Sequence, residues 1–213
     1  FSAMRRKIII GLSIAIVLLA CAGIYLRNGF YGNCVPEQQS LYVRTGSDYR
    51  TLEDSLKSAI EHFAFFRLYA RHVELDRSLK PGHYILEKGM NVVQVTRMLK
   101  LGLQTPVRVT INNVRTPAQL AGKLSRQIEA DSTAIFGALT DPETARKAGF
   151  DSVTLFSMFI PDTYEFYWTV SPAQFIERMR REYDRFWTPE RDAKRKRSGL
   201  SRLEVMTLAS IVY

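Results

Sequence analysis

Hydrophobic side chains form one long uninterrupted run near the start of the chain. The run covers residues 8–26, nineteen residues without a charged side chain. As an α-helix, a run of this length spans about 28 Å, close to the hydrocarbon thickness of a bilayer. A cleaved signal peptide usually has a shorter apolar core, of about 7–15 residues. The pattern therefore predicts an uncleaved transmembrane helix at residues 8–26.

Basic residues on the two sides of the run predict its orientation. Residues 5–7 are Arg-Arg-Lys, whereas only Arg27 follows the run closely. The positive-inside rule therefore leaves residues 1–7 in the cytoplasm as a short stub and exports the rest of the chain. Residues 1–3 precede the expected initiator Met4, so they are left out of the fold predictions.

The two cysteines bear on how the chain is attached to the membrane. Cys21 ends a Leu-Leu-Ala-Cys sequence that resembles a lipoprotein cleavage site. The apolar run continues beyond it to Leu26, which favours an anchor, with a lipoprotein attached through Cys21 as the alternative. Cys34 is then a single exported thiol. A disulfide between the two is discounted, because it would have to reach into the membrane.

A small α+β module is predicted after a linker at residues 27–40, which are rich in Gly, Asn and Pro. Alternating apolar residues indicate its strands, and apolar residues three or four apart indicate its helices. Asn91 and Gly102 have the residue types that begin and end a helix. The predicted elements are a strand at 41–43, a helix with apolar positions between 52 and 63, a short helix at 64–71, a strand at 83–86 and a helix at 92–101.

A second, mostly helical region is predicted from residue 105 onwards. Capping boxes, in which a Ser or Thr is followed three residues later by Gln or Glu, mark three helix starts. The predicted elements are a strand at 107–111, helices capped by Thr116, Ser171 and Ser201, two short polar helices at 132–139 and 142–148, and a charged connector at 188–198.

The helix that follows Ser201 is apolar on all sides, which predicts that it is buried. It continues to the last residue, Tyr213. A domain rarely ends in the middle of its central helix, so we expect the chain to be truncated there.

Composition and motifs exclude several classes of protein. Hydrophobic residues make up 46% of the chain and charged residues 24%, as in ordinary globular proteins. Two cysteines are too few for a disulfide scaffold or a four-cysteine zinc site. The sequence also lacks the motifs of nucleotide-binding proteins, zinc proteases and α/β-hydrolases. Its three histidines are interpreted as satisfied or solvated, so no metal and no cofactor is predicted.

The net charge of +9 does not indicate nucleic-acid binding. Four positive charges lie beside the apolar run, at positions 5–7 and 27. The Lys-Arg-Lys-Arg sequence at 194–197 is interpreted as a solvated turn, and an exported domain does not meet chromosomal DNA. Contact of this turn with the anionic outer face of a membrane or with acidic peptides is the alternative.

Residues 156–168 concentrate six aromatic side chains around a Pro-Asp turn. In one interpretation the segment is a loop that packs its aromatic rings into the core, while Asp162 binds local backbone amides. In the other it lines a carbohydrate groove, where aromatic faces stack on sugars and carboxylates accept hydrogen bonds from hydroxyl groups. Both interpretations stay open on the residues alone.

The order of these features resembles the YceG-like family of membrane-bound endolytic murein transglycosylases. The resemblance rests on an N-terminal anchor, a LysM-like module at 41–104 and part of a catalytic domain at 105–213. The motifs that carry it are Gly-His-Tyr-Ile-Leu at 82–86, Leu-Lys-Leu-Gly at 99–102, Phe-Ile-Pro-Asp-Thr-Tyr-Glu-Phe at 159–166 and Thr-Leu-Ala-Ser-Ile-Val at 207–212.

The resemblance implies a lyase that cleaves β-1,4 bonds between N-acetylmuramic acid and N-acetylglucosamine inside nascent peptidoglycan strands, leaving 1,6-anhydromuramyl ends. It also implies anchoring in the bacterial inner membrane and penicillin-binding synthases as partners in cell-wall assembly and remodelling. In such an enzyme one glutamic acid with a raised pKa protonates the leaving oxygen, and its carboxylate then takes the proton of the muramyl 6-hydroxyl group. The substrate-binding residues that the resemblance points to are Pro161, Asp162, Thr163, Tyr164, Glu165 and Ser210.

The chain departs from the family pattern at the catalytic residue. The family's glutamate directly follows the Ala-Ser-Ile-Val motif, where this chain has Tyr213. The acid is therefore expected just after Tyr213, no catalytic residue is assigned within the chain, and these 213 residues are predicted to be inactive. Glu204 is no substitute, because its capping box explains it. The alternative functions are an inactive or truncated membrane-anchored glycan-binding module and a basic adaptor at the membrane surface.

Overall fold

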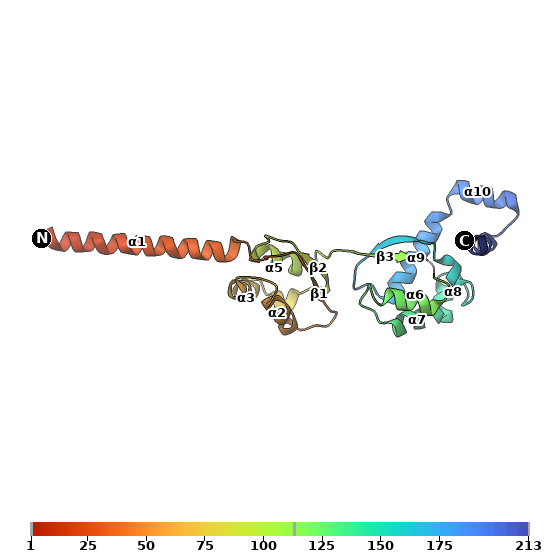
Figure 1. The fold of residues 1–213 in the computed structure, drawn as a ribbon, viewed down its shortest axis with the longest axis horizontal. Helices are drawn as coiled ribbons and strands as arrows, with labels where there is room; N and C mark the ends of the chain where they lie inside the picture. Colours follow the sequence, from red (N-terminus) through yellow and green to blue (C-terminus); the bar gives the residue numbers. More distant parts are fainter. Residues whose placement is uncertain (1, 113, 213) are drawn as a thin grey trace. The chain divides into compact units, whose positions relative to one another are not determined.

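The chain forms two compact units, Phe1–Thr105 and Pro106–Tyr213, in a computed structural model that describes residues 2–112 and 114–212 (Figure 1). Each unit has its own cluster of buried hydrophobic side chains. The architecture is a mixture of helices with two small antiparallel sheets, which agrees with the predicted combination of helices and strands. Each unit contains one of these sheets, and each sheet has two strands.

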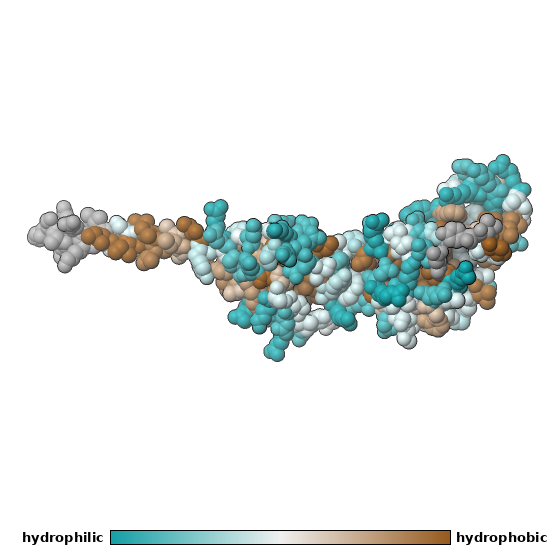
Figure 2. Space-filling model, viewed as in Figure 1, coloured by the Kyte–Doolittle hydropathy of each residue, from teal (hydrophilic) through white to brown (hydrophobic). Residues whose placement is uncertain are grey.

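The first unit begins with the long helix α1 (Ser2–Tyr31), and the part of this helix that is coloured in Figure 2 is mostly brown. Its segment Ile10–Tyr31 has a mean hydropathy of 2.1 in its most apolar 18-residue window, which the protein does not bury, so the segment is long and apolar enough to cross a membrane. A signal sequence near an N-terminus can also pass this test of length and hydropathy, so the test alone does not identify an anchor. The remaining elements are β1 (Gln39–Val43), α2 (Tyr49–Lys57), α3 (Phe63–His72), α4 (Leu75–Ser78), β2 (Gly82–Leu86) and α5 (Val92–Leu101).

Two predictions for the first unit need correction. Residues 27–40 are not a free linker, because α1 continues to Tyr31 and the apolar side chains of Cys34 and Val35 are buried in the module. The apolar positions between 52 and 63 do not form one helix. His62 has a left-handed backbone conformation (φ 57°), which separates α2 from α3.

The second unit contains β3 (Val107–Ile111), α6 (Pro117–Leu124), α7 (Ser132–Thr140), α8 (Pro142–Lys147), the 3₁₀-helix η1 (Leu155–Met158), β4 (Asp162–Phe166), α9 (Pro172–Phe186), α10 (Pro189–Ser198) and α11 (Arg202–Val212). The predicted capping residues Thr116, Ser171 and Ser201 all accept a hydrogen bond from the backbone N–H three residues further on. Short helices at 132–140 and 142–147 are confirmed.

Three features of the second unit differ from the predictions. The aromatic segment contains the strand β4 instead of only a loop, since its residues pair with β3. Residues 189–198 form the helix α10 instead of an irregular connector, because Thr188 caps a segment of strong helix formers. Helix α11 is not buried: Val205 and Met206 pack against the core, but Leu208 is 50% and Ile211 is 74% exposed. The prediction that α11 is buried because it is apolar on all sides is therefore wrong.

Candidate functional site

The motif at residues 159–166 contains the strand β4, which pairs antiparallel with β3. In this register Glu165 lies opposite Arg108, and Thr163 lies opposite Thr110. Side chains alternate between the two faces of a strand, and directly opposed residues share a face. These four residues therefore lie on one face of the sheet.

We call this set, Arg108, Thr110, Thr163 and Glu165, the polar face. Arg108, Thr163 and Glu165 are exposed, and Thr110 is half-buried. The hydroxyl oxygens of Thr110 and Thr163 lie 2.8 Å apart and share a hydrogen bond. The face thus presents a cation, a carboxylate and hydroxyl groups on a paired backbone, a combination that can bind a hydroxyl-rich ligand.

The opposite face of the sheet is part of the hydrophobic core. Tyr164 is 8% exposed, and its hydroxyl group donates a 2.8 Å hydrogen bond to the backbone oxygen of Ile160. Burial raises the pKa of Tyr164 to about 12, so the phenol stays neutral. The rings of Phe159 and Phe166 lie 5.9 Å and 5.2 Å from the ring of Phe175 on α9. Packing into the core therefore accounts for most of the aromatic side chains in this segment.

Tyr167 differs from the aromatic residues that pack into the core. It directly follows β4, and 57% of its surface is exposed. Asp162 and Pro161, at the start of the strand, are also exposed, and Asp162 accepts a 2.6 Å hydrogen bond from the backbone N–H of Thr163. The predicted local bond of Asp162 is confirmed. Exposed groups for a ligand are thus present on the strand and at both its ends.

Ser210, another predicted substrate-binding residue, lies on a different element from the other five. It is exposed on α11, and its hydroxyl group donates a 2.7 Å hydrogen bond to the backbone oxygen of Thr207. The structure therefore gathers residues 161–165 on or beside β4 and places Ser210 separately. Tyr213, after which the catalytic acid is expected, lies outside the described residues.

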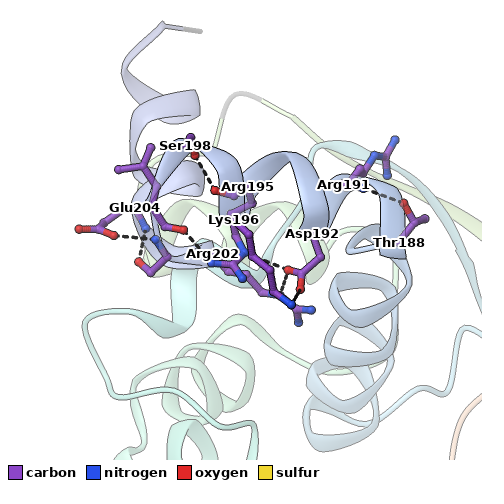
Figure 3. A network of polar contacts seen from close by, with 10 residues as sticks. Thr188, Arg191, Asp192, Arg195, Lys196, Ser198, Arg202 and Glu204 are labelled. Carbon is purple, nitrogen blue, oxygen red and sulfur yellow. Dashed lines mark hydrogen bonds and ion pairs between the residues drawn. The ribbon is translucent and has the colours of Figure 1, made fainter.

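Glu204 at the start of α11 has the capping role that its sequence context predicted. Its side chain accepts a 2.7 Å hydrogen bond from the Ser201 backbone N–H, while the Ser201 hydroxyl accepts from the Glu204 N–H at 3.2 Å (Figure 3). The bond from the Ser201 backbone lowers the pKa of Glu204. A general acid must carry a proton before the reaction, so an ionised capping carboxylate is unsuited to that role.

An ion pair between Arg202 and Asp192 attaches the start of α11 to α10. Asp192 accepts hydrogen bonds from Arg195 at 2.9 Å and from Arg202 at 3.1 Å (Figure 3). The hydrogen bonds from Arg195 and then Arg202 lower the pKa of Asp192. The guanidinium group of Arg202 also lies 5.4 Å from the centre of the Trp187 ring, at the end of α9. Arg202 therefore connects α11 to both preceding helices.

The lowered pKa of Asp192 predicts a pH-dependent contribution to stability. A carboxylate whose pKa is lower in the folded state stabilises the fold above its unfolded pKa of about 3.9, and this contribution is lost as the pH falls through the folded pKa. We expect Asp192→Asn to lower the urea midpoint of the second unit at pH 7 and to leave it unchanged in strong acid. The control is Glu190→Gln, since the Glu190–Lys194 pair is exposed. An equal loss at both pH values would contradict the assignment.

No metal centre is evident in the part of the chain that the structure describes, where no group of three or more His, Cys, Asp or Glu side chains is placed to hold an ion. The interpretation of the histidines is confirmed: His62 and His72 are exposed, and His83 is buried with both ring nitrogens bonded. The bonding partners of His83 are the backbone oxygen of Thr105 and the hydroxyl group of Ser40, each at 3.1 Å.

Sequence reasoning did not name Arg108 and Thr110 as members of the candidate site, and it considered Tyr167 only as one of the aromatic residues of segment 156–168. The alternation Asp-Thr-Tyr-Glu-Phe-Tyr at 162–167 was the available signal, because it places Thr163, Glu165 and Tyr167 on the side away from the core. The contribution of β3 could not be read in the same way, since it depends on a pairing between segments about fifty residues apart.

Comparison with known proteins gives one family. The sequence model of the YceG-like family matches residues 41–213. A crystal structure of a YceG-like protein from Listeria monocytogenes is similar to this chain, with a TM-score of 0.41 and 20% identity over 76% of the chain. The similar region spans 59% of that protein. A search of curated proteins found no match.

Proposed function

Since this chain belongs to the YceG-like family, we propose that it acts on bacterial peptidoglycan as part of an endolytic lytic transglycosylase. The observation that carries the proposal is the family match over residues 41–213, a range that includes both strands of the polar face. The reaction cleaves the β-1,4 bond after N-acetylmuramic acid and leaves a 1,6-anhydro end, in cell-wall assembly and remodelling.

The polar face supplies chemistry that suits a glycan strand. The exposed ring of Tyr167 offers an apolar surface on which a pyranose can stack. Glu165 and Thr163 accept hydrogen bonds from sugar hydroxyl groups, and the guanidinium group of Arg108 can pair with the carboxylate of a peptide stem. We assign these residues to binding and orientation of the strand.

The catalytic step requires one carboxylic acid and no water. Its proton goes to the oxygen of the leaving sugar, and the resulting carboxylate then takes the proton of the muramyl 6-hydroxyl group as that oxygen attacks the anomeric carbon. We propose that this acid is the glutamate expected just after Tyr213, so that these 213 residues by themselves release no anhydro product. Burial in a partly apolar surrounding raises the pKa of such a group, which keeps it protonated at neutral pH.

We further propose that α1 tethers the enzyme to the inner membrane, with a cytoplasmic N-terminus. The length and hydropathy of Ile10–Tyr31 support a single span, and the basic residues at 5–7 support its orientation. The LysM-like residues 41–104 then hold glycan close to the membrane, where new strands emerge. Penicillin-binding synthases, which produce those strands, are the proposed partners.

A binding measurement on the 213-residue chain tests the assignment of the polar face. We expect Tyr167→Ala and Glu165→Gln each to weaken binding to soluble glycan strands by about tenfold, the typical effect of losing one charged hydrogen bond or ring contact. Phe136→Ala and Glu143→Gln are matched controls, since Phe136 is 43% exposed and the Glu143 side chain 60% exposed elsewhere in the unit. Equal binding by all four variants would contradict the assignment.

The alternative of a glycan-binding protein without activity predicts the same binding results. It differs in the products: strands would be bound by the native protein and recovered uncleaved. A basic adaptor predicts salt-sensitive binding to anionic lipid and no affinity for glycan. The two measurements together therefore separate the three functions.

A further inference from the structure

Aromatic rings join the end of α1 to the rest of the first unit. The ring of Tyr25 lies 5.4 Å from that of Phe65 on α3, in an edge-to-face arrangement. Phe30 lies 5.1 Å from Phe65 and 6.2 Å from Tyr69, also edge to face. A β-carbon at position 29 would clash with the Phe65 ring, so glycine permits this close approach. The end of α1 is therefore packed against α3.

These contacts determine the depth of α3 if α1 spans a membrane. Tyr25 belongs to the apolar segment Ile10–Tyr31, and Arg27 follows it by two residues. An aromatic residue next to an arginine at the end of a span is typical of the interface between hydrocarbon and headgroups. Because Phe65 contacts Tyr25, α3 has to lie at this same level.

The exposed side of α3 has a composition that suits this level. Leu68 is 58% exposed, and it lies three residues from both Phe65 and Arg71. Residues three apart are neighbours on a helix surface, so Leu68 lies between the ring that contacts α1 and an exposed arginine. Arg67 is also exposed, and α3 contains no acidic residue.

We propose that α3 is a membrane-docking helix, with Leu68 inserted among the lipids and Arg67 and Arg71 against the phosphates of anionic headgroups. Such helices bind in the plane of the interface through apolar side chains on one side and basic side chains beside them. The inference rests on the proposed anchoring by α1. The bilayer that α3 binds is the one that α1 crosses, because the contact of Tyr25 with Phe65 joins the surface of α1 to that of α3.

Depth-dependent quenching in vesicles tests the docking. The full 213-residue chain, with Cys21→Ala and Cys34→Ala, carries one environment-sensitive nitrobenzoxadiazole label at Leu68→Cys. The vesicles contain phosphatidylglycerol and lipids with a nitroxide near the headgroup. The matched control is Leu101→Cys at the end of α5, because Leu101 is 55% exposed and Leu68 58%. We expect strong quenching and a blue-shifted emission at position 68 only.

The arginines are tested in the same vesicles. Attraction of one basic residue to an anionic membrane corresponds to about a fivefold change in equilibrium. We expect Arg71→Ala to lower the ratio of lipid-inserted to water-exposed label at position 68 by about that factor. Arg50→Ala on α2 should leave the ratio unchanged. Replacing phosphatidylglycerol with phosphatidylcholine removes the anionic partner of both Arg67 and Arg71, so it should lower the ratio at least as much as Arg71→Ala.

Flotation of the vesicles distinguishes the two ways in which the experiment can fail. A chain that does not float with the vesicles overturns the anchoring and, with it, the docking. A chain that floats while the labels at positions 68 and 101 are quenched alike overturns the docking of α3 alone. If the label at position 68 is quenched but Arg71→Ala does not change the ratio of inserted to exposed label, the role of the anionic headgroups is overturned.

Discussion

Replacing Phe175 with alanine is expected to lower the free energy of unfolding of the second unit by about 3–5 kcal/mol. Phe175 is 1% exposed and packs its ring against Phe159 and Phe166 on either side of the Pro161 turn. Its loss removes the transfer free energy of the ring and leaves a cavity under β4. We therefore expect both stability and the position of the polar face to suffer.

Urea unfolding followed by tryptophan fluorescence measures this loss in the second unit alone, because Trp168 and Trp187, the two tryptophans of the chain, both belong to it. Phe136→Ala is the control, since Phe136 is 43% exposed and its loss should cost about 0.5 kcal/mol or less. A loss below about 1 kcal/mol for Phe175→Ala would contradict the packing described for β4 and α9.

Replacing Leu18 with arginine is expected to oppose membrane insertion of α1 by about 2.5–3.5 kcal/mol, which is roughly a hundredfold change in the partition between membrane and water. Leu18 lies in the interior of the Ile10–Tyr31 segment, and its side chain is 64% exposed, so no protein contact shields an introduced charge. The measurement is the fraction of protein that stays in the membrane after alkaline extraction.

The control for Leu18→Arg is Leu101→Arg, which adds the same charge at a site 55% exposed outside the span. Cys21→Ser addresses the lipoprotein alternative in the same experiment. A spanning anchor retains the protein in the membrane after Cys21→Ser, whereas a lipoprotein loses its attachment. Full retention of Leu18→Arg together with release of Cys21→Ser would contradict the anchor.

Local signals were sufficient to predict many of the helices. Asn91, Thr116 and Ser171 have side chains that bind the backbone three residues later, so each helix start could be read from a few neighbouring residues. Helix α10 was missed because it buries no residue. Its stability comes instead from the cap at Thr188 and from arginine contacts such as Arg195–Asp192, which carry no hydrophobic pattern.

The candidate site was predictable only in part, because it depends on contacts between distant segments. The motif at 159–166 attracted attention by its residues, and Thr163 and Glu165 are indeed exposed. Tyr164 is in the core, and only the pairing of β3 with β4 shows that Arg108 faces the same side as Glu165. The exposure of α11 likewise depends on which other segments pack against it, and this cannot be predicted from the residues of α11 alone.

The chemical identity of the products tests the proposed function most directly. The native protein is incubated with uncross-linked peptidoglycan strands, and the new glycan ends are identified by mass spectrometry. We predict shortened strands with 1,6-anhydromuramyl ends, and no such product after a Glu→Gln change at the first glutamate that follows Tyr213. Strands that remain intact, or new reducing ends heavier by one water molecule as a hydrolase would leave them, would contradict the transglycosylase.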